Sequence, residues 1–73
     1  MRAKEMFEKL GFEEIKLVNC IVYENTNDDV EIDFEFATKE FHLCGIYYIS
    51  LGLLKAINKQ VEELGWLEEK ESE

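Results

Sequence analysis

Basic residues are scarce in this chain of 73 residues. It holds 8 Lys and Arg against 17 Asp and Glu, which gives a formal net charge of −9 at pH 7. Because binding to nucleic-acid phosphates needs a basic surface, this balance argues against a direct nucleic-acid-binding protein. An acidic protein of this size is suited either to solubility alone or to docking on a basic surface that normally holds nucleic acid.

Long apolar runs are also absent, and the N-terminus lacks the charged and then apolar profile of a signal peptide. The chain has only two cysteines, Cys20 and Cys44. Without a secretion signal, these are expected to be reduced thiols in a cytosol, and a disulfide is the alternative. The sequence therefore predicts a cytoplasmic protein without a transmembrane segment.

Sequence motifs for catalysis are missing as well. There is no glycine pattern for binding phosphates and no metalloprotease helix motif. Cys20 and His42 would be the candidate thiolate–imidazolium pair, but no Gly-rich loop or helix N-terminus adjoins either residue to form an oxyanion hole. We therefore expect that the protein is not an enzyme.

The clearest pattern present is an alternation of apolar and polar residues over 30–44. Val30, Ile32, Phe34 and Phe36 alternate with Glu31, Asp33 and Glu35, and after a polar break the alternation resumes with Phe41 and Leu43 against His42 and Cys44. A period of two is typical of strands with one face toward a core and one toward water. The pattern predicts a β-hairpin with strands at 29–36 and 40–44.

The flanking segments complete an α+β prediction of one domain over residues 1–67. Residues 3–10 and the stretch from Ser50 to Gly65 have helical spacing. Residues 14–24 are expected to form one strand, whose core-facing residues are Ile15, Leu17, Asn19, Ile21 and Tyr23. The predicted order is helix, three-stranded antiparallel meander, helix (αβββα), with both helices on the Phe34 side of the sheet. Residues 68–73 are expected to form a charged tail.

The predicted register brings a possible metal site together on the open face. Two-residue turns at Thr26-Asn27 and Thr38-Lys39 would place Asp33 opposite both Cys20 and Cys44, with His42 two residues from Cys44. Two thiols, an imidazole and a carboxylate form a plausible tetrahedral zinc set, so Cys20, Asp33, His42 and Cys44 are the candidate ligands of a structural zinc ion. The alternative is that the cysteines are small half-buried apolar residues.

Two further groups of residues are candidates for partner binding. Glu31, Asp33 and Glu35 line one strand face, although a charge run is also typical of a solvated surface. Tyr47 and Tyr48 are large aromatics of the kind favoured as interface anchors, or they close the edge of the core. Val18 and Val22 on the open face leave both a monomer and a homodimer open.

The opening M-R-A-K-E-M-F-E-K-L-G-F and the closing L-L-K-A-I-N-K-Q-V-E-E-L-G-W-L resemble small proteins encoded in phages and prophages of Gram-positive bacteria. That family shares the order of helix, strand meander and final helix, and the resemblance covers most of the chain in pattern. Cys20, His42 and Cys44 lie outside the shared pattern, so the zinc prediction depends on this sequence alone.

Small acidic phage proteins include inhibitors of host defence, among them anti-CRISPR proteins that act on the Cas9 effector. The resemblance implies a non-enzymatic inhibitor in the bacterial cytoplasm, which binds a basic nucleic-acid-handling surface of a host nuclease and blocks nucleic-acid loading. The alternative is a zinc-stabilised accessory or structural module of the phage without a role in defence.

Overall fold

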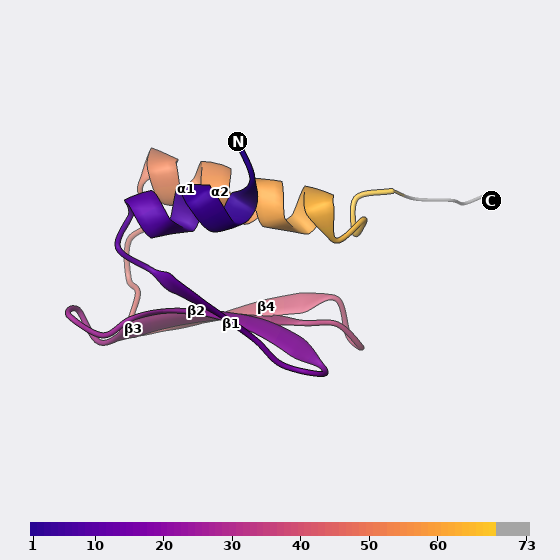
Figure 1. Cartoon of the computed structure of the whole chain (residues 1–73), viewed down its shortest axis with the longest axis horizontal. Coiled ribbons are helices and arrows are strands. Elements are labelled where there is room, and N and C mark those ends of the chain that lie inside the picture. The colour runs from indigo at the N-terminus through magenta and orange to yellow at the C-terminus, as the bar shows by residue number, and fades with distance from the viewer. Residues whose placement is uncertain (69–73) are drawn as a thin grey trace.

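The computed structural model describes residues 1–68 as a helical layer over an antiparallel sheet (Figure 1). Both helices lie on the same face of the sheet, and no helix within the described residues covers the other face (Figure 1). The predicted tail, apart from Glu68, lies outside the described residues. The elements are α1 (Ala3–Lys9), β1 (Glu13–Lys16), β2 (Cys20–Asn25), β3 (Val30–Glu35), β4 (Glu40–Cys44) and α2 (Leu51–Glu63).

The sheet has four strands in the order β1-β2-β3-β4, so the prediction of three strands is wrong. Residues 14–24 form two strands, because the chain reverses in a tight turn that the amide of Leu17 closes by donating to the carbonyl of Cys20 at 2.9 Å. Val18 lies at the tip of this turn and is 99% exposed. Because of this turn, Ile15 pairs with Val22 on the open face, and Leu17 is 53% exposed. The prediction that Ile15 and Leu17 lie toward the core with Ile21 is therefore wrong.

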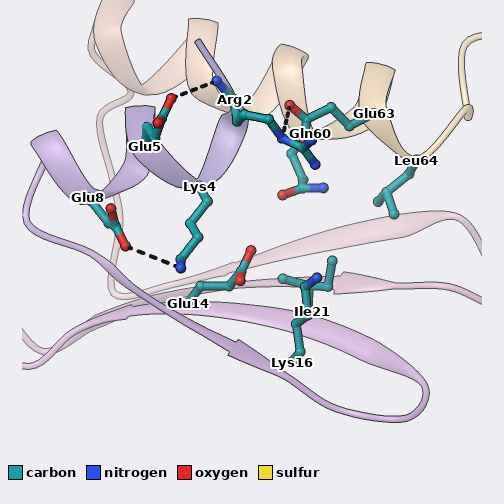
Figure 2. Close-up of a pocket in the computed structure, with 10 residues that line it drawn as sticks. All are labelled: Arg2, Lys4, Glu5, Glu8, Glu14, Lys16, Ile21, Gln60, Glu63 and Leu64. Carbon is teal, nitrogen blue, oxygen red and sulfur yellow. Dashed lines mark hydrogen bonds and ion pairs between the residues drawn. The ribbon is translucent and has the colours of Figure 1, made fainter.

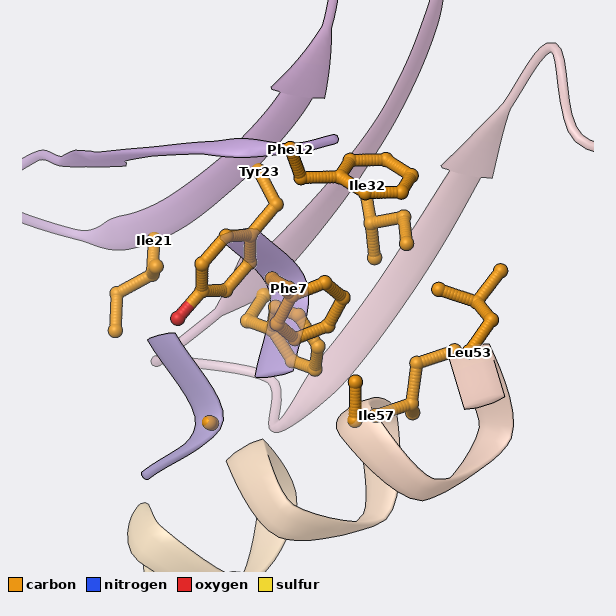
Figure 3. Packing of buried hydrophobic residues seen from close by; sticks show 10 residues of the cluster. Phe7, Phe12, Ile21, Tyr23, Ile32, Leu53 and Ile57 are labelled. Carbon is orange, nitrogen blue, oxygen red and sulfur yellow. The ribbon is translucent and has the colours of Figure 1, made fainter. Parts of the chain in front are cut away.

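The core lies between the helices and the sheet (Figure 3). Phe7 of α1 stacks on Tyr23 of β2 with ring centroids 3.9 Å apart, and it meets Phe34 of β3 edge-on at 6.2 Å. Ile57 contributes a buried side chain from α2 to the same cluster. Burial of Ile21, Tyr23, Ile32 and Phe34 confirms the core face that the alternation predicted.

Both helices have residues suited to capping at their ends. Ser50 caps α2, since its side-chain oxygen accepts a hydrogen bond from the amide of Leu53 at 3.1 Å. Gly11 and Gly65 both have positive φ, which lets the chain turn back after each helix. No helix within residues 1–68 combines the length and the apolar character needed to cross a membrane.

The strand register differs by two residues from the prediction. Cys20 pairs with Glu35, Asp33 with His42, and Glu31 with Cys44. Four-residue loops at 26–29 and 36–39 replace the predicted two-residue turns. Asn25 stays in β2 and its side-chain oxygen accepts from the amides of Asn27 and Asp28, so the first loop is centred one residue later than its composition suggested.

Candidate functional site

The open side of the sheet gathers carboxylates from all four strands. Paired residues in an antiparallel sheet share a face, so the register places one row as Glu13–Glu24–Glu31–Cys44 and the next as Ile15–Val22–Asp33–His42. No strand residue on this face is a Lys or Arg. We call this surface the acidic sheet face; its carboxylates belong to Glu13, Glu24, Glu31, Asp33, Glu35 and Glu40.

Within the acidic sheet face, Glu31 and Asp33 interact directly with each other. A hydrogen bond with Asp33, the negative charge of Asp33, partial burial and the nearby Glu24 all raise the pKa of the Glu31 carboxyl above its ordinary value. One side-chain oxygen of Asp33, Oδ1, is buried without a hydrogen-bond partner within residues 1–68. The fold thus holds like charges together without a Lys or Arg on the strand positions of this face.

Cys20 lies at the margin of the same face and is buried. Burial raises the pKa of its thiol, and the negative charges of Glu35 and Asp33 raise it further. The thiol form is therefore favoured at neutral pH over the thiolate that a nucleophile or a metal ligand requires. This environment supplies no chemical reason to assign Cys20 a catalytic role.

The observed register pairs two of the four predicted zinc ligands, Asp33 and His42, but separates the two cysteines from them and from each other. Cys20 sits beside Glu35 at one end of β3, and Cys44 sits beside Glu31 at the other end, about 13 Å further along the strand. Within residues 1–68, no three His, Cys, Asp or Glu side chains are grouped so as to hold a metal ion. The prediction that Cys20, Asp33 and Cys44 lie side by side is therefore wrong, and a structural zinc ion stays a prediction that metal analysis would test.

The predicted partner-binding residues fall into two places. Glu31, Asp33 and Glu35 do share one face of β3, within the acidic sheet face. Tyr47 and Tyr48 lie in the segment that rises from β4 to α2 (Figure 1), and they are 88% and 92% exposed, so they do not close the edge of the core. Sequence reasoning missed Ile49 and Leu51, which extend this exposed apolar segment.

Apart from the acidic sheet face, a pocket with a volume of about 460 Å³ lies between the helices and β1 (Figure 2). Its charged side chains are largely matched within the protein. Glu63 of α2 accepts a hydrogen bond from the amide of Ala3 at 2.9 Å and lies 3.8 Å from the guanidinium of Arg2. Lys4 pairs with Glu8 along α1. Because the contacts of Glu63 join the start of α1 to α2, we assign this pocket a structural role.

The hydroxyl group of Tyr23 contacts two residues that line this pocket. This buried hydroxyl lies 2.9 Å from a carboxylate oxygen of Glu14 and also contacts the side-chain amide of Gln60. Burial and the charge of Glu14 raise the pKa of Tyr23, so the hydroxyl keeps its proton. This network ties β1 and β2 to α2.

Replacement of Tyr23 by Phe is expected to destabilise the fold by about 1–3 kcal/mol, because Gln60 would be left buried without its hydroxyl partner. Urea unfolding followed by circular dichroism measures the loss. Tyr47→Phe is the matched control, since Tyr47 is exposed and should change stability by less than about 0.5 kcal/mol. Equal effects of the two variants would contradict a stabilising network at Tyr23.

The raised pKa of Glu31 predicts a pH dependence of stability. The folded protein binds this proton more tightly than the unfolded chain does, so the related stability is present below the ordinary value of 4.5 and is lost as pH rises through the folded pKa. Asp33→Asn removes the carboxylate whose hydrogen bond and negative charge raise this pKa. At low salt we expect this variant to have a higher Tm than the parent at pH 7, with the difference shrinking as the pH falls towards 4.5. A constant difference would contradict the proposed repulsion.

Comparison of this chain with family models, curated proteins and solved structures finds no match.

Proposed function

We propose that this protein is a non-enzymatic binding protein, whose acidic sheet face docks on a basic, nucleic-acid-handling surface of another protein. The observation that carries the proposal is the gathering of six carboxylates on one uncovered face, with no Lys or Arg among the strand residues there. Complementary charge of this kind accelerates association and gives it a strong dependence on salt.

The local energetics of the face support a binding role over a purely solvating one. Glu31 and Asp33 repel each other, and the buried Oδ1 of Asp33 has no hydrogen-bond partner among the described residues. A solvated surface does not need either feature, and both lower the stability of the folded chain. Features that lower stability without a local gain are concentrated at functional sites.

The specific form of the proposal follows the resemblance of the sequence to small phage proteins. In that form the partner is a host defence nuclease in the bacterial cytoplasm, and a Cas9-type effector is the first partner to examine. Such effectors hold nucleic acid in a positively charged channel. An acidic face seated in that channel would exclude guide RNA or target DNA by occupying its site, without any chemical step.

The test is inhibition of target-DNA cleavage by a purified Cas9-type effector, with the protein added before or after the guide RNA. The parent chain should inhibit, and the triple variant Glu31→Lys, Asp33→Lys and Glu35→Lys should lose at least about tenfold in inhibitory potency, equivalent to 1.4 kcal/mol of binding free energy. Inhibition should also weaken as the salt concentration rises.

The matched control reverses three charges away from the acidic sheet face, with Glu8→Lys, Glu62→Lys and Glu68→Lys. These residues are exposed on or beyond the helices, and the change in net charge is the same. Equal loss in both triple variants would show that net charge alone is responsible and that the face is not the contact. No inhibition by the parent chain would remove the nuclease-inhibitor form of the proposal.

A further inference from the structure

The two edges of the sheet are protected to different degrees. A sheet edge presents unpaired backbone groups, and natural proteins guard it with short strands, charged side chains, prolines or bulges. β1 has only four residues, and three of them, Glu13, Glu14 and Lys16, are charged. β4 has five residues in unbroken register with β3, and Glu40 is its only Asp, Glu, Lys or Arg. β4 is therefore the unguarded edge.

The side chains along β4 present different chemistry on the two faces. On the helix side, Phe41 stacks on Phe34 with centroids 5.6 Å apart and is still 40% exposed. On the open side, Glu40 and His42 lie beside Glu35 and Asp33 of the acidic sheet face. An added strand would thus meet an apolar surface with one set of alternate residues and carboxylates with the other.

We propose that β4 receives an extended strand of the basic partner, in which Lys or Arg alternates with apolar residues. This inference rests on the proposed function and specifies how the partner is bound. Strands in a sheet are about 4.8 Å apart, so a Lys or Arg on a fifth strand would lie beside Glu40, in the row that continues to Glu35 of β3. The intervening apolar residues would cover Phe41, as in other cases of strand addition to a sheet edge.

Charge favours this occupant over a second copy of the chain. Pairing two β4 edges would join two proteins that each carry a formal charge of −9. A continuous sheet would also bring two acidic sheet faces side by side, and like charges across strands are destabilising. A basic strand removes this repulsion.

The experiment compares two peptides of about eight residues, a typical strand length, that have the same composition of Lys and Val. One peptide alternates the two residues and the other places them in two blocks. Binding to the full chain is measured by calorimetry, and hydrogen exchange of the backbone amides locates the contact. The alternating peptide should bind at least about tenfold more tightly, equivalent to 1.4 kcal/mol, and should slow exchange in residues 40–44.

Phe41→Lys places a guarding charge on β4 and should abolish the preference for the alternating peptide. Leu54→Lys is the matched control, since it also replaces an apolar residue with Lys at a comparably exposed position, but on α2, away from both β4 and the acidic sheet face, and it should keep the preference. The peptide comparison in the parent chain tests the proposal even if a variant folds poorly.

The outcomes distinguish strand addition at β4 from docking by the acidic sheet face. Equal binding of both peptides, without protection of β4, would overturn strand addition and leave the proposed acidic docking face intact. If neither peptide binds, the proposed function fails as well. A dimer of the free protein with slowed exchange in β4 would assign this edge to a second copy and overturn the inference.

Discussion

Replacement of Phe7 by Ala is expected to remove most of the stability of the fold. Phe7 is fully buried and contacts three aromatic rings, those of Phe12, Tyr23 and Phe34. Removing a buried phenyl ring costs about 3–5 kcal/mol, from lost burial and from the cavity that remains. The total stability of a domain of this length is about 4–11 kcal/mol, so the variant should be near its unfolding transition.

Far-UV circular dichroism during urea unfolding measures this loss. Phe41→Ala is the matched control, because Phe41 also stacks on Phe34 but lies at the exposed edge strand. We expect the control to remain folded with a clearly smaller loss. Similar losses in the two variants would show that the cluster around Phe7 does not dominate the core.

Replacement of Gly45 by Ala is the second substitution with a large expected effect. Gly45 has φ +76° at the exit from β4, and an added Cβ would lie 2.8 Å from the carbonyl oxygen of Asp29. The left-handed conformation alone costs a residue with a Cβ about 1–2 kcal/mol. The contact adds to this cost, because its partner is backbone in the loop before β3 and has little freedom to move.

Gly65→Ala isolates the effect of the contact. Gly65 has the same φ of +76°, but an added Cβ would meet nothing within 4 Å among residues 1–68. Both variants should lose stability in thermal or urea unfolding, and Gly45→Ala should lose distinctly more. Equal losses would show that the chain around residue 45 relaxes and that only the backbone conformation matters.

The sequence predicts the layers of this fold better than its strand count. Alternation over 30–44 identifies the buried positions Ile32 and Phe34, because a period of two follows directly from strand geometry. The turn at 17–19 escapes detection because it contains no glycine or proline and because Val18, at its tip, favours strands. Tertiary packing, and not local propensity, decides that the chain reverses there.

For the acidic sheet face, the sequence predicts only which carboxylates of one strand share a face. Glu31, Asp33 and Glu35 share a face because of their spacing, whatever pairing the strands adopt. Glu13, Glu24 and Glu40 join them only through the register, and the register depends on loop lengths that composition leaves uncertain. The same two-residue difference in register moved Cys20 and Cys44 to opposite ends of β3 and removed the geometric argument for zinc.

The order of the strands also has a consequence for how the chain folds. Each strand pairs with the next one in sequence, so the entire sheet is built from local hairpins. Contacts of high sequence separation arise where α1 meets α2, as between Ala3 and Glu63. Chains dominated by local contacts fold quickly, because little loop-closure entropy is lost before contacts form. We expect the hairpins to form early and the docking of the two helices to complete folding, which would leave the helix pair as the last part to be protected in refolding experiments.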